Sequence, residues 1–391
     1  MIRAIHVSND FEPLSGGIST HLKNLIPALA KEDVEPVLLV PQATEQEKRE
    51  IFVDERYTSF QVVRIPFRRS KNPVNTLIRL TQATREGLDW IETKFGKPDI
   101  IHQHDSRATR LGATQHARKR EIPIIWTNHS SGFFRKSDFT ARMLAHLPGI
   151  HPDGLVVVHR MMVKRFENEW SDCPVKYIPN GVNPDHFQPG KKEKNPKTKV
   201  LFPQRMIPGK GAEELAEAAA ILLSEDPDAS IQFRFAGSDH ASNRDRTTIG
   251  RVKKRLSPWI ETDAVQFLGN LPYSEILQEY IYADMVVLPF KMGTESLSLY
   301  EAWAAGTPVI SVYLEEANNF VLDDENCLLL DEAEPRQIVS AIQRLMSDPV
   351  LSGRLAQSGL QMARSECRWE QRAESTKFFY EEILAGRNLK R

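Results

Sequence analysis

The chain has 391 residues, of which 41% are hydrophobic and 26% are charged. This length predicts two or three domains with large cores, and the balance is ordinary for soluble domains. The 51 Lys and Arg residues nearly balance the 52 Asp and Glu residues, so the formal net charge of -1 gives no sign of a nucleic-acid partner.

The three cysteines are too few and too scattered for a disulfide framework or a metal site: Cys173, Cys327 and Cys367. They are typical of free thiols in a reducing compartment. The apolar part of the N-terminal MIRAIHVSND is too short for a signal peptide, and no stretch approaches the roughly 18 apolar residues of a membrane span. We therefore expect a cytoplasmic protein.

In chain order, residues 2–7 predict a first strand, and the apolar spacing of residues 22–29 predicts the helix after it. Gly16 and Gly17 stand directly before this helix. Two glycines there allow the backbone to approach a ligand and to direct N–H groups at a phosphate. The alternative is a tight turn without a ligand. Later strands are predicted at 34–40, 99–102, 122–126 and 155–158.

Residues 61–120 contain thirteen basic and five acidic residues, an excess of eight positive charges. Periodicity is weak between residues 41 and 97, so few elements are predicted there. The charge indicates either a solvated face or a surface that attracts an anionic acceptor or the inner membrane leaflet. Phe67, Ile78 and Leu80 could supply apolar contacts to such a membrane. The basic residues include Arg64, Arg68, Arg69, Arg118, Lys119 and Arg120.

Four histidines lie close together in the sequence: His102, His104, His116 and His129. The spacing of His102 and His104 is wrong for two ligands on one helix face, although a strand could present both, and no cysteine or glutamate cluster completes a set. We expect no metal. His129 follows a predicted strand directly, which places it at the carboxyl end of that strand. A structural histidine bonded to neighbouring carbonyls is the alternative.

Residues 189–199 are polar, basic and rich in proline, which predicts an interdomain linker. A strand at 200–203 follows, and a helix is predicted at 213–223. Between them, Arg205 and Lys210 lie five residues apart in a loop with glycine and proline. Cations at a helix start suit a diphosphate, because charge, guanidinium donors and helix N–H groups converge there. Ordinary surface charge is the alternative.

Residues 284–289 predict a buried strand and residues 308–311 the next one. Between them, Ser298 and Glu301 have the spacing of a capping box, which predicts a helix that begins near Ser298 and ends at Gly306. The loop before this helix lies at the carboxyl end of a parallel strand, where ligands bind in open α/β sheets. Further strands are predicted at 231–236 and 265–269. Aromatic residues of a last helix at 372–384 are expected to pack: Phe378, Phe379 and Tyr380.

The run from Glu295 to Leu299, followed by Glu301-Ala-Trp-Ala-Ala-Gly-Thr-Pro-Val-Ile, resembles the donor-site signature of the family 4 glycosyltransferases. These are retaining enzymes with the GT-B fold. In the family the two glutamates are eight residues apart, but here they are six apart. Counting eight back from Glu301 gives Gly293. Either Glu295 takes the first role on a shortened connection, or that role is vacant.

The resemblance implies a role for each matching residue. Glu295 and His129 would flank the donor sugar as the catalytic pair. No metal is implied, and the nucleotide sugar, which we expect to carry UDP, is a co-substrate rather than a cofactor. The implied donor-binding residues are Gly16, Gly17, Arg205 and Lys210 for the diphosphate, Glu301 for the ribose, Leu271 for the base, and Ser298 and Leu299 beside it.

The implied fold is α/β and GT-B, with two Rossmann-like, doubly wound parallel-sheet domains facing across a cleft. We expect an acceptor-side domain at 1–187, a donor domain at 188–371, and a C-terminal helix at about 372–391 that packs back on the first domain. The implied reaction moves a sugar from a nucleotide-diphospho-sugar to a hydroxyl of a glycan or lipid-linked acceptor. The enzyme would act in bacterial-type glycan, glycolipid, lipopolysaccharide or other cell-surface polysaccharide biosynthesis. It would work in the cytoplasm, and a location at the inner face of the membrane is one option. A sugar-nucleotide epimerase or phosphorylase, and a catalytically silent sugar-nucleotide-binding protein, are the alternatives.

Overall fold

The computed structural model describes residues 1–13, 16–44, 50–104, 107–129, 151–187, 196–237, 243–291, 296–312 and 320–388. It divides into two compact units. Unit 1 contains Met1–Gly181 and Trp369–Arg391, and unit 2 contains Val182–Arg368. Each unit is a parallel sheet with helices packed on it, as the alternation of strands and helices predicts.

Unit 1 has an eight-stranded sheet in the order β3-β4-β2-β1-β5-β6-β7-β8. All pairs in it are parallel except β3 with β4. Its described elements are β1 (Ile2–Val7), α1 (Gly17–Leu29), β2 (Val34–Thr44), β3 (Phe52–Val53), β4 (Gln61–Arg68), α2 (Pro73–Phe95), β5 (Ile100–His104), α3 (Arg107–Arg120), β6 (Ile124–Asn128), β7 (Gly154–Val157), α5 (Met162–Glu169), β8 (Val175–Tyr177) and α12 (Trp369–Asn388).

Unit 2 has a six-stranded, fully parallel sheet in the order β11-β10-β9-β12-β13-β14. Its described elements are η2 (Pro184–His186), β9 (Thr198–Phe202), α6 (Ala212–Glu225), β10 (Ile231–Ala236), α7 (Asn243–Ile260), β11 (Val265–Gly269), α8 (Tyr273–Tyr282), β12 (Met285–Leu288), α9 (Leu297–Ala304), β13 (Val309–Val312), β14 (Leu328–Leu330), α10 (Pro335–Ser347) and α11 (Pro349–Ser365).

Central strands of a doubly wound sheet are buried because helices cover both faces, and some of them, such as β12 (MVVL), are continuous apolar runs. Every residue of β12 and β13 is buried, and so is every residue of β5 and β6. Such runs are readable from sequence. The predicted strands at 2–7, 231–236 and 265–269 match the bounds of β1, β10 and β11.

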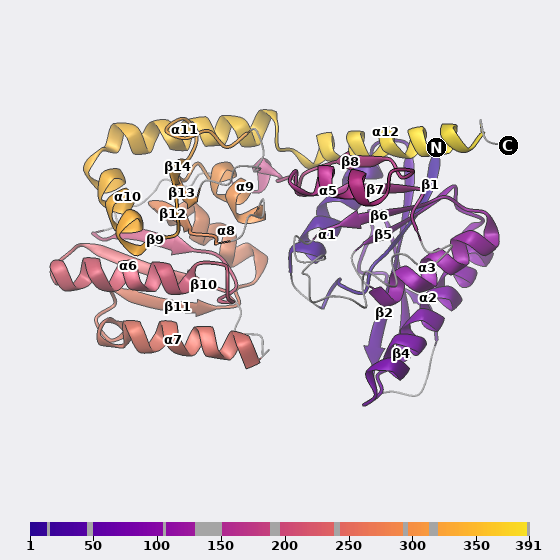
Figure 1. Cartoon of the computed structure of the whole chain (residues 1–391), viewed down its shortest axis with the longest axis horizontal. Helices are drawn as coiled ribbons and strands as arrows, with labels where there is room; N and C mark the ends of the chain where they lie inside the picture. The colour runs from indigo at the N-terminus through magenta and orange to yellow at the C-terminus, as the bar shows by residue number, and fades with distance from the viewer. Residues whose placement is uncertain are drawn as a thin grey trace. The chain divides into compact units, whose positions relative to one another are not determined.

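Helix α2 is the largest element that the sequence did not predict. Asn72 caps it by accepting from the Val74 N–H at 2.9 Å, and Pro73 is its first residue. Its buried face mixes Leu80, Leu88 and Ile91 with small and polar residues, and α2 and α3 pack so closely that a Cβ on Gly112 would clash with Thr84 (Figure 1). The threonine, alanine and glycine positions interrupt the apolar spacing of this face, which makes the helix harder to recognise from hydrophobic periodicity.

The division between the units falls at Gly181/Val182 and at Arg368/Trp369, whereas the sequence prediction placed it at residues 187 and 371. Val182 and Phe187 are buried in the apolar core of unit 2, which explains why they belong to it. Helix α12 belongs to unit 1, where a Cβ on Gly154 of β7 would meet Phe379 and Ile383. Most of the predicted linker at 189–199 lies outside the described residues.

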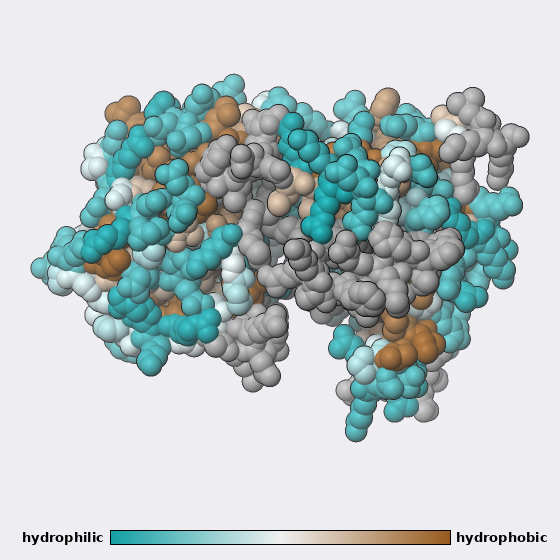
Figure 2. All heavy atoms as spheres, viewed as in Figure 1, coloured by the Kyte–Doolittle hydropathy of each residue, from teal (hydrophilic) through white to brown (hydrophobic). Residues whose placement is uncertain are grey.

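The basic excess predicted at 61–120 is partly paired within unit 1. Arg64 is buried and bonded to Asp54, Arg118 pairs with Asp153, and Arg120 pairs with Asp89. Phe67 and Leu80 were named as residues that could supply apolar contacts to a membrane, but both are buried in the core. Their side chains point into the sheet–helix layer, which leaves Ile78 exposed together with Val74. Figure 2 shows a brown patch in the part of unit 1 that contains β4 and α2.

The three cysteines are free thiols, as the sequence predicts. Among the described helices, none has both the length and the apolar character that crossing a membrane requires.

Candidate active site

In unit 2, residues 203–211 connect β9 to α6 and carry both cations of the predicted diphosphate clamp, so we name this segment the cation loop. Gly211 ends it with φ +85°, and a Cβ there would overlap the carbonyl oxygen of Pro289. The Lys291 N–H donates to the Gly209 carbonyl at 3.2 Å. The cation loop is therefore packed against the carboxyl end of the neighbouring strand β12, and only glycine allows this approach.

The two cations of the loop differ in exposure. Arg205 is exposed, whereas the half-buried Lys210 holds its ammonium 5.0 Å from the centre of the Phe290 ring. Burial, and after it the positive charge of Arg205, lowers the pKa of Lys210 to about 8. Because the positive charge of Arg205 disfavours the charged form of Lys210, an anion bound between them is favourable, since it offsets this repulsion. A diphosphate has the charge to satisfy both.

The acids nearest in sequence do not supply that negative charge. Glu213 pairs with Arg251, and Glu214 pairs with Lys291. Both carboxylates lie in the first turn of α6, where they are stabilised by the helix dipole and by their own partners. Within the part of the chain that the structure describes, no ion pair of Arg205 is found.

A glutamine that the sequence analysis did not single out joins the cation loop to the start of α9. Gln204 donates from Nε2 to the hydroxyl oxygens of Ser296 and Ser298, at 2.7 Å each, and Ser298 donates to the Pro203 carbonyl at 3.2 Å. All three side chains are buried. Buried polar groups that bond one another in this way fix the positions of the two segments that carry them.

The capping box predicted for Ser298 and Glu301 is wrong. The N-cap of α9 is Ser296, whose hydroxyl accepts from the Ser298 N–H at 3.2 Å, and the helix begins at Leu297. Glu301 lies too far into the helix to cap it. Its carboxylate instead accepts from the Tyr280 hydroxyl of α8 at 2.8 Å, so the alternative that Glu301 merely caps its own helix is also wrong.

The environment of Glu301 keeps its carboxyl group easily protonated. Burial raises its pKa to about 7, and the hydrogen bond from Tyr280 opposes part of this shift. A carboxylate in this state is a strong acceptor with few bonds of its own. It is suited to accept from ligand hydroxyl groups such as those of a ribose.

For the other predicted site residues of unit 2, the structure gives the burial of two and does not describe the third. Leu299 is buried. Leu271, which follows β11 in the chain, is half-buried and packs against the edge of the apolar core of unit 2. Glu295 lies outside the described residues, so its predicted catalytic role stays a prediction.

In unit 1, Gly16 is the N-cap of α1 and Gly17 is the first residue of that helix. Both are exposed. Gly16 has φ 165°, an extended conformation open to any residue, and no described atom lies within 4 Å of a Cβ built on it. Neither strain nor close packing within the described residues therefore accounts for Gly16. A ligand that approaches the backbone would account for it, in keeping with the phosphate role.

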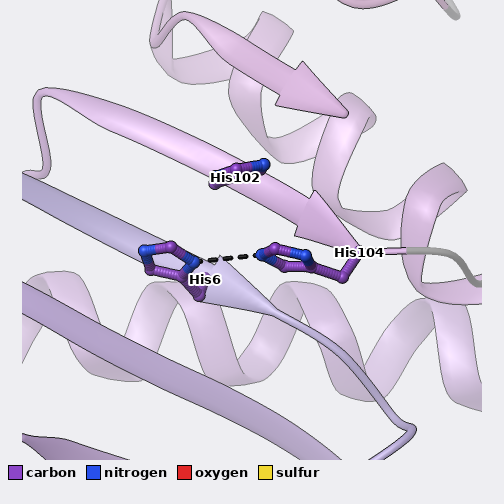
Figure 3. Close-up of side chains that lie close together, drawn as sticks. All are labelled: His6, His102 and His104. Atoms are coloured by element: carbon purple, nitrogen blue, oxygen red, sulfur yellow. Dashed lines mark hydrogen bonds between the residues drawn. The ribbon is translucent and has the colours of Figure 1, made fainter. Parts of the chain in front are cut away.

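His129 lies at the end of β6, as predicted, but it belongs to a cluster that the sequence analysis missed. We name the five residues the histidine cluster: His6, His21, His102, His104 and His129. Register explains the meeting, because His6 on β1 pairs with His102 on β5 and His104 follows on the same face (Figure 3). His21 comes from α1, which begins directly after Gly16.

Hydrogen bonds link these rings in a row. His6 Nδ1 lies 3.0 Å from His104 Nε2, and His104 Nδ1 lies 3.0 Å from His129 Nε2. Burial is the main cause that lowers the pKa of all five histidines below the ordinary value, to about 4 for His21. The imidazoles are therefore neutral at pH 7, and His129 acts there as a neutral hydrogen-bonding group.

Two residues outside the histidine cluster, Tyr380 and Thr127, complete this row of hydrogen bonds within unit 1. The Tyr380 hydroxyl of α12 lies 2.6 Å from His102 Nδ1 and 3.4 Å from His6 Nε2, and His102 Nε2 lies 2.5 Å from the Thr127 hydroxyl. The prediction that Phe379 and Tyr380 pack is confirmed, since both are buried, but Phe378 is exposed and Tyr380 also bonds the cluster. The spacing of His102 and His104 was the one clue in the sequence.

Sequence comparison agrees with this geometry. The profile of Glycosyltransferase Family 4 matches residues 15–186, and the profile of Glycosyl transferases group 1 matches residues 183–362. Two Rossmann-like units, one with a built cation loop, define a glycosyltransferase of the GT-B fold. The chain belongs to the family 4 glycosyltransferases.

Individual relatives are distant but similar over their whole length. A D-inositol 3-phosphate glycosyltransferase of Corynebacterium glutamicum is 24% identical, over 96% of this chain and 94% of the relative. A GDP-mannose-dependent monoacylated alpha-(1-6)-phosphatidylinositol monomannoside mannosyltransferase of the same species is 22% identical, over 94% and 95%.

Solved structures with the same fold include sucrose-phosphate synthase from Thermosynechococcus elongatus, with TM-score 0.81, 20% identity and 99% and 100% coverage. Another is the Anabaena protein HepE in complex with UDP and glucose, with TM-score 0.74, 14% identity and 98% and 100% coverage. At these identities the likeness shows the fold alone.

Proposed function

We propose that this glycosyltransferase moves a sugar, with retention of configuration and without a metal ion, from a UDP-sugar to a hydroxyl group of a phosphorylated or lipid-linked acceptor. The observation that carries the donor assignment is the cation loop, in which burial and the positive charge of Arg205 lower the pKa of the half-buried Lys210 to about 8. Cations held in a built loop can neutralise the charge that develops on a departing diphosphate without a divalent ion.

Each predicted donor residue would have one role. Arg205, Lys210 and the N–H groups at the start of α1 would bind the diphosphate, and Glu301 would accept from the ribose. Ser298 and Leu299 would lie beside the nucleotide, and Leu271 near the base. His129 and Glu295 would flank the sugar.

The chemistry needs no side chain as a base. In the proposed step the bond from the anomeric carbon to the diphosphate oxygen breaks, and the acceptor oxygen bonds to the same carbon on the same face. The departing phosphate oxygen takes the acceptor proton. The products are a glycoside of retained configuration and a nucleoside diphosphate. Neutral His129 would donate or accept one hydrogen bond at a sugar hydroxyl while positive charge develops on the ring.

Two observations support an acceptor that bears phosphate or lipid. The relatives described above carry inositol 3-phosphate and phosphatidylinositol mannoside in their names. On this chain, exposed Val74 and Ile78 of α2 lie near exposed Arg68 and Arg69, which suits a contact with an anionic membrane face. We place the enzyme in bacterial glycolipid or cell-surface polysaccharide synthesis, at the cytoplasmic face of the membrane.

The donor assignment is tested by calorimetric titration of UDP-glucose and UDP. Replacing both Arg205 and Lys210 by alanine should weaken binding by about 100-fold or more, the scale of lost charged contacts to a developing anion. The matched control is Lys254→Ala, which removes an exposed lysine of α7 in the same unit. Equal affinity in the double variant and the control would refute the clamp.

The alternatives are separated by turnover. A panel of UDP-, GDP- and ADP-sugars is assayed for nucleotide release with inositol phosphates and lipid-linked acceptors, with and without Glu295→Gln. Sustained release that disappears in the variant supports transfer. Tight binding without release supports a silent binding protein, and a changed sugar without release supports an epimerase.

A further inference from the structure

Three imidazoles of the histidine cluster converge on one point inside unit 1. His21 comes from α1, His104 ends β5 and His129 follows β6. One nitrogen of each lies within 4.8 Å of the others. The rings are close, with centroids 4.5 Å apart for His21 and His129 and 5.3 Å apart for His104 and His129. This is the spacing from which three ligands can reach a single ion.

The orientation of His21 is set by an amide. Its Nδ1–H donates to the Asn180 side-chain oxygen at 3.0 Å, so its Nε2 carries a lone pair. That nitrogen is buried, and it has no hydrogen-bond partner among the described residues. A buried acceptor without a partner is unfavourable, which calls for a group that it could bind. A metal ligand held by a carbonyl on its other nitrogen has this arrangement.

The orientation of His104 is set by the rest of the cluster. One consistent direction of hydrogen bonds runs from His104 Nε2–H to His6 Nδ1, from His6 Nε2–H to the Tyr380 oxygen, and from the Tyr380 hydroxyl to His102 Nδ1. His102 Nε2–H then donates to Thr127. In this arrangement His104 Nδ1 carries a lone pair, and it lies 3.0 Å from His129 Nε2.

A second triad of the cluster is a poorer candidate. His6, His102 and His104 also lie within reach of one another (Figure 3). Both nitrogens of His102, however, are bonded to groups outside the triad, one to Tyr380 and the other to Thr127, whereas among the described residues the Nδ1 atom of His104 is bonded only to His129, a member of the proposed triad. His102 and His6 therefore serve to orient His104 rather than to bind an ion themselves.

We propose that His21, His104 and His129 form a binding site for a divalent transition-metal ion of the Zn²⁺ or Co²⁺ type. Three neutral imidazoles suit these ions, whereas Mg²⁺ and Ca²⁺ require oxygen ligands that the triad does not offer. Asn180 and His6 would orient the ligands from outside. The three ligands are different residues from those of the proposed diphosphate clamp, and binding of the ion does not depend on the proposed reaction.

Occupancy of this site would have a consequence for His129. A nitrogen bound to the ion cannot contact a sugar hydroxyl, so the ion should inhibit sugar transfer rather than support it. This outcome agrees with a transfer step that itself needs no metal.

The direct test is titration of the full chain, purified without a histidine tag, with Co²⁺ while visible absorption is recorded. One equivalent should give the intense d–d bands of a four-coordinate site, and Zn²⁺ should displace them. His21→Gln should abolish these bands, whereas His151→Gln, which removes an exposed histidine of the same unit, should leave them unchanged. Absence of the bands in the wild type, or equal bands in His21→Gln, would overturn the proposal.

A second variant covers the case in which His21→Gln does not fold. Asn180→Ala keeps all three ligands but removes the group that orients His21, so Co²⁺ affinity should fall 10- to 100-fold. Asn183→Ala, whose side chain bonds His186 in unit 2, is the matched control and should not change the affinity. Equal affinity in the two asparagine variants would show that the triad does not bind the ion.

Discussion

The hydroxyl group of Tyr280 donates to the carboxylate of Glu301 at 2.8 Å, across the packing of α8 on α9. This contact ties the residue proposed to bind ribose to a neighbouring helix rather than to its own helix start. It also sets the protonation of Glu301, because the hydrogen bond stabilises the charged form while burial disfavours it.

The first prediction concerns Tyr280→Phe. The variant removes the bond that favours ionised Glu301, so the pKa of this carboxyl should rise above its value of about 7. At pH 7 more of it would be protonated, and the KM for the donor should increase several-fold. The increase should shrink at pH 8.5, where the carboxyl ionises again. A KM that is unchanged from pH 6 to 8.5 would contradict the role of Glu301.

The second prediction concerns stability and the same carboxyl. The pKa of Glu301 is raised from 4.5 to about 7 on folding. A group with a raised pKa contributes stability that is fully present below pH 4.5 and lost as the pH rises through 7. Relative to Glu301→Gln, the wild type should therefore gain thermal stability as the pH falls from 8 to 5. Parallel Tm curves for the two proteins would argue against a buried carboxyl.

The third prediction concerns Lys210, whose pKa is lowered to about 8. As the pH rises above 8, the ammonium loses its proton and the attraction to a diphosphate weakens. The Kd for UDP should therefore increase between pH 7.5 and 9.5. Lys210→Arg keeps its charge over this range, so its Kd should be nearly constant. Calorimetric titration measures both, and identical pH profiles would remove Lys210 from the clamp.

The fourth prediction concerns the shape of the cation loop. Gly211→Ala forces a Cβ against the Pro289 carbonyl at a positive φ, so it should destabilise the chain by about 2 kcal/mol or more. Gly250→Ala is the matched control, because it lies within helix α7 with open space around its Cβ. It should stabilise by about 0.5–1 kcal/mol. Urea denaturation measures both.

The fifth prediction concerns Gly16. No described atom opposes a Cβ there and the φ is extended, so Gly16→Ala should leave the Tm within about 2 °C. Donor affinity should still fall, because the Cβ would separate the helix start from the phosphate. A loss of affinity without a loss of stability distinguishes a phosphate contact from a turn. Unchanged affinity would leave the glycine pair without a binding role.

The sequence determined the fold class, the central strands of both sheets and the place of the cation loop, whereas β3, β4 and β8 were not predicted. The buried parallel strand β12 is the continuous apolar run MVVL, so it is read from local composition. The two cations of the loop lie five residues apart on one short segment, so their proximity is visible in the sequence itself. Helix α2 was missed because threonine, alanine and glycine interrupt the apolar spacing of its packed face.

Only the tertiary structure decided which polar groups meet. His6, His104 and Tyr380 are far apart along the chain, and strand register together with the packing of α12 brings them to one place. In the same way, Glu301 has the spacing of a capping residue, but the hydroxyl of Tyr280 on another helix bonds its carboxylate. Hydrogen bonds depend on distances of about 3 Å between groups that no local periodicity relates, so a sequence read along its length does not contain them.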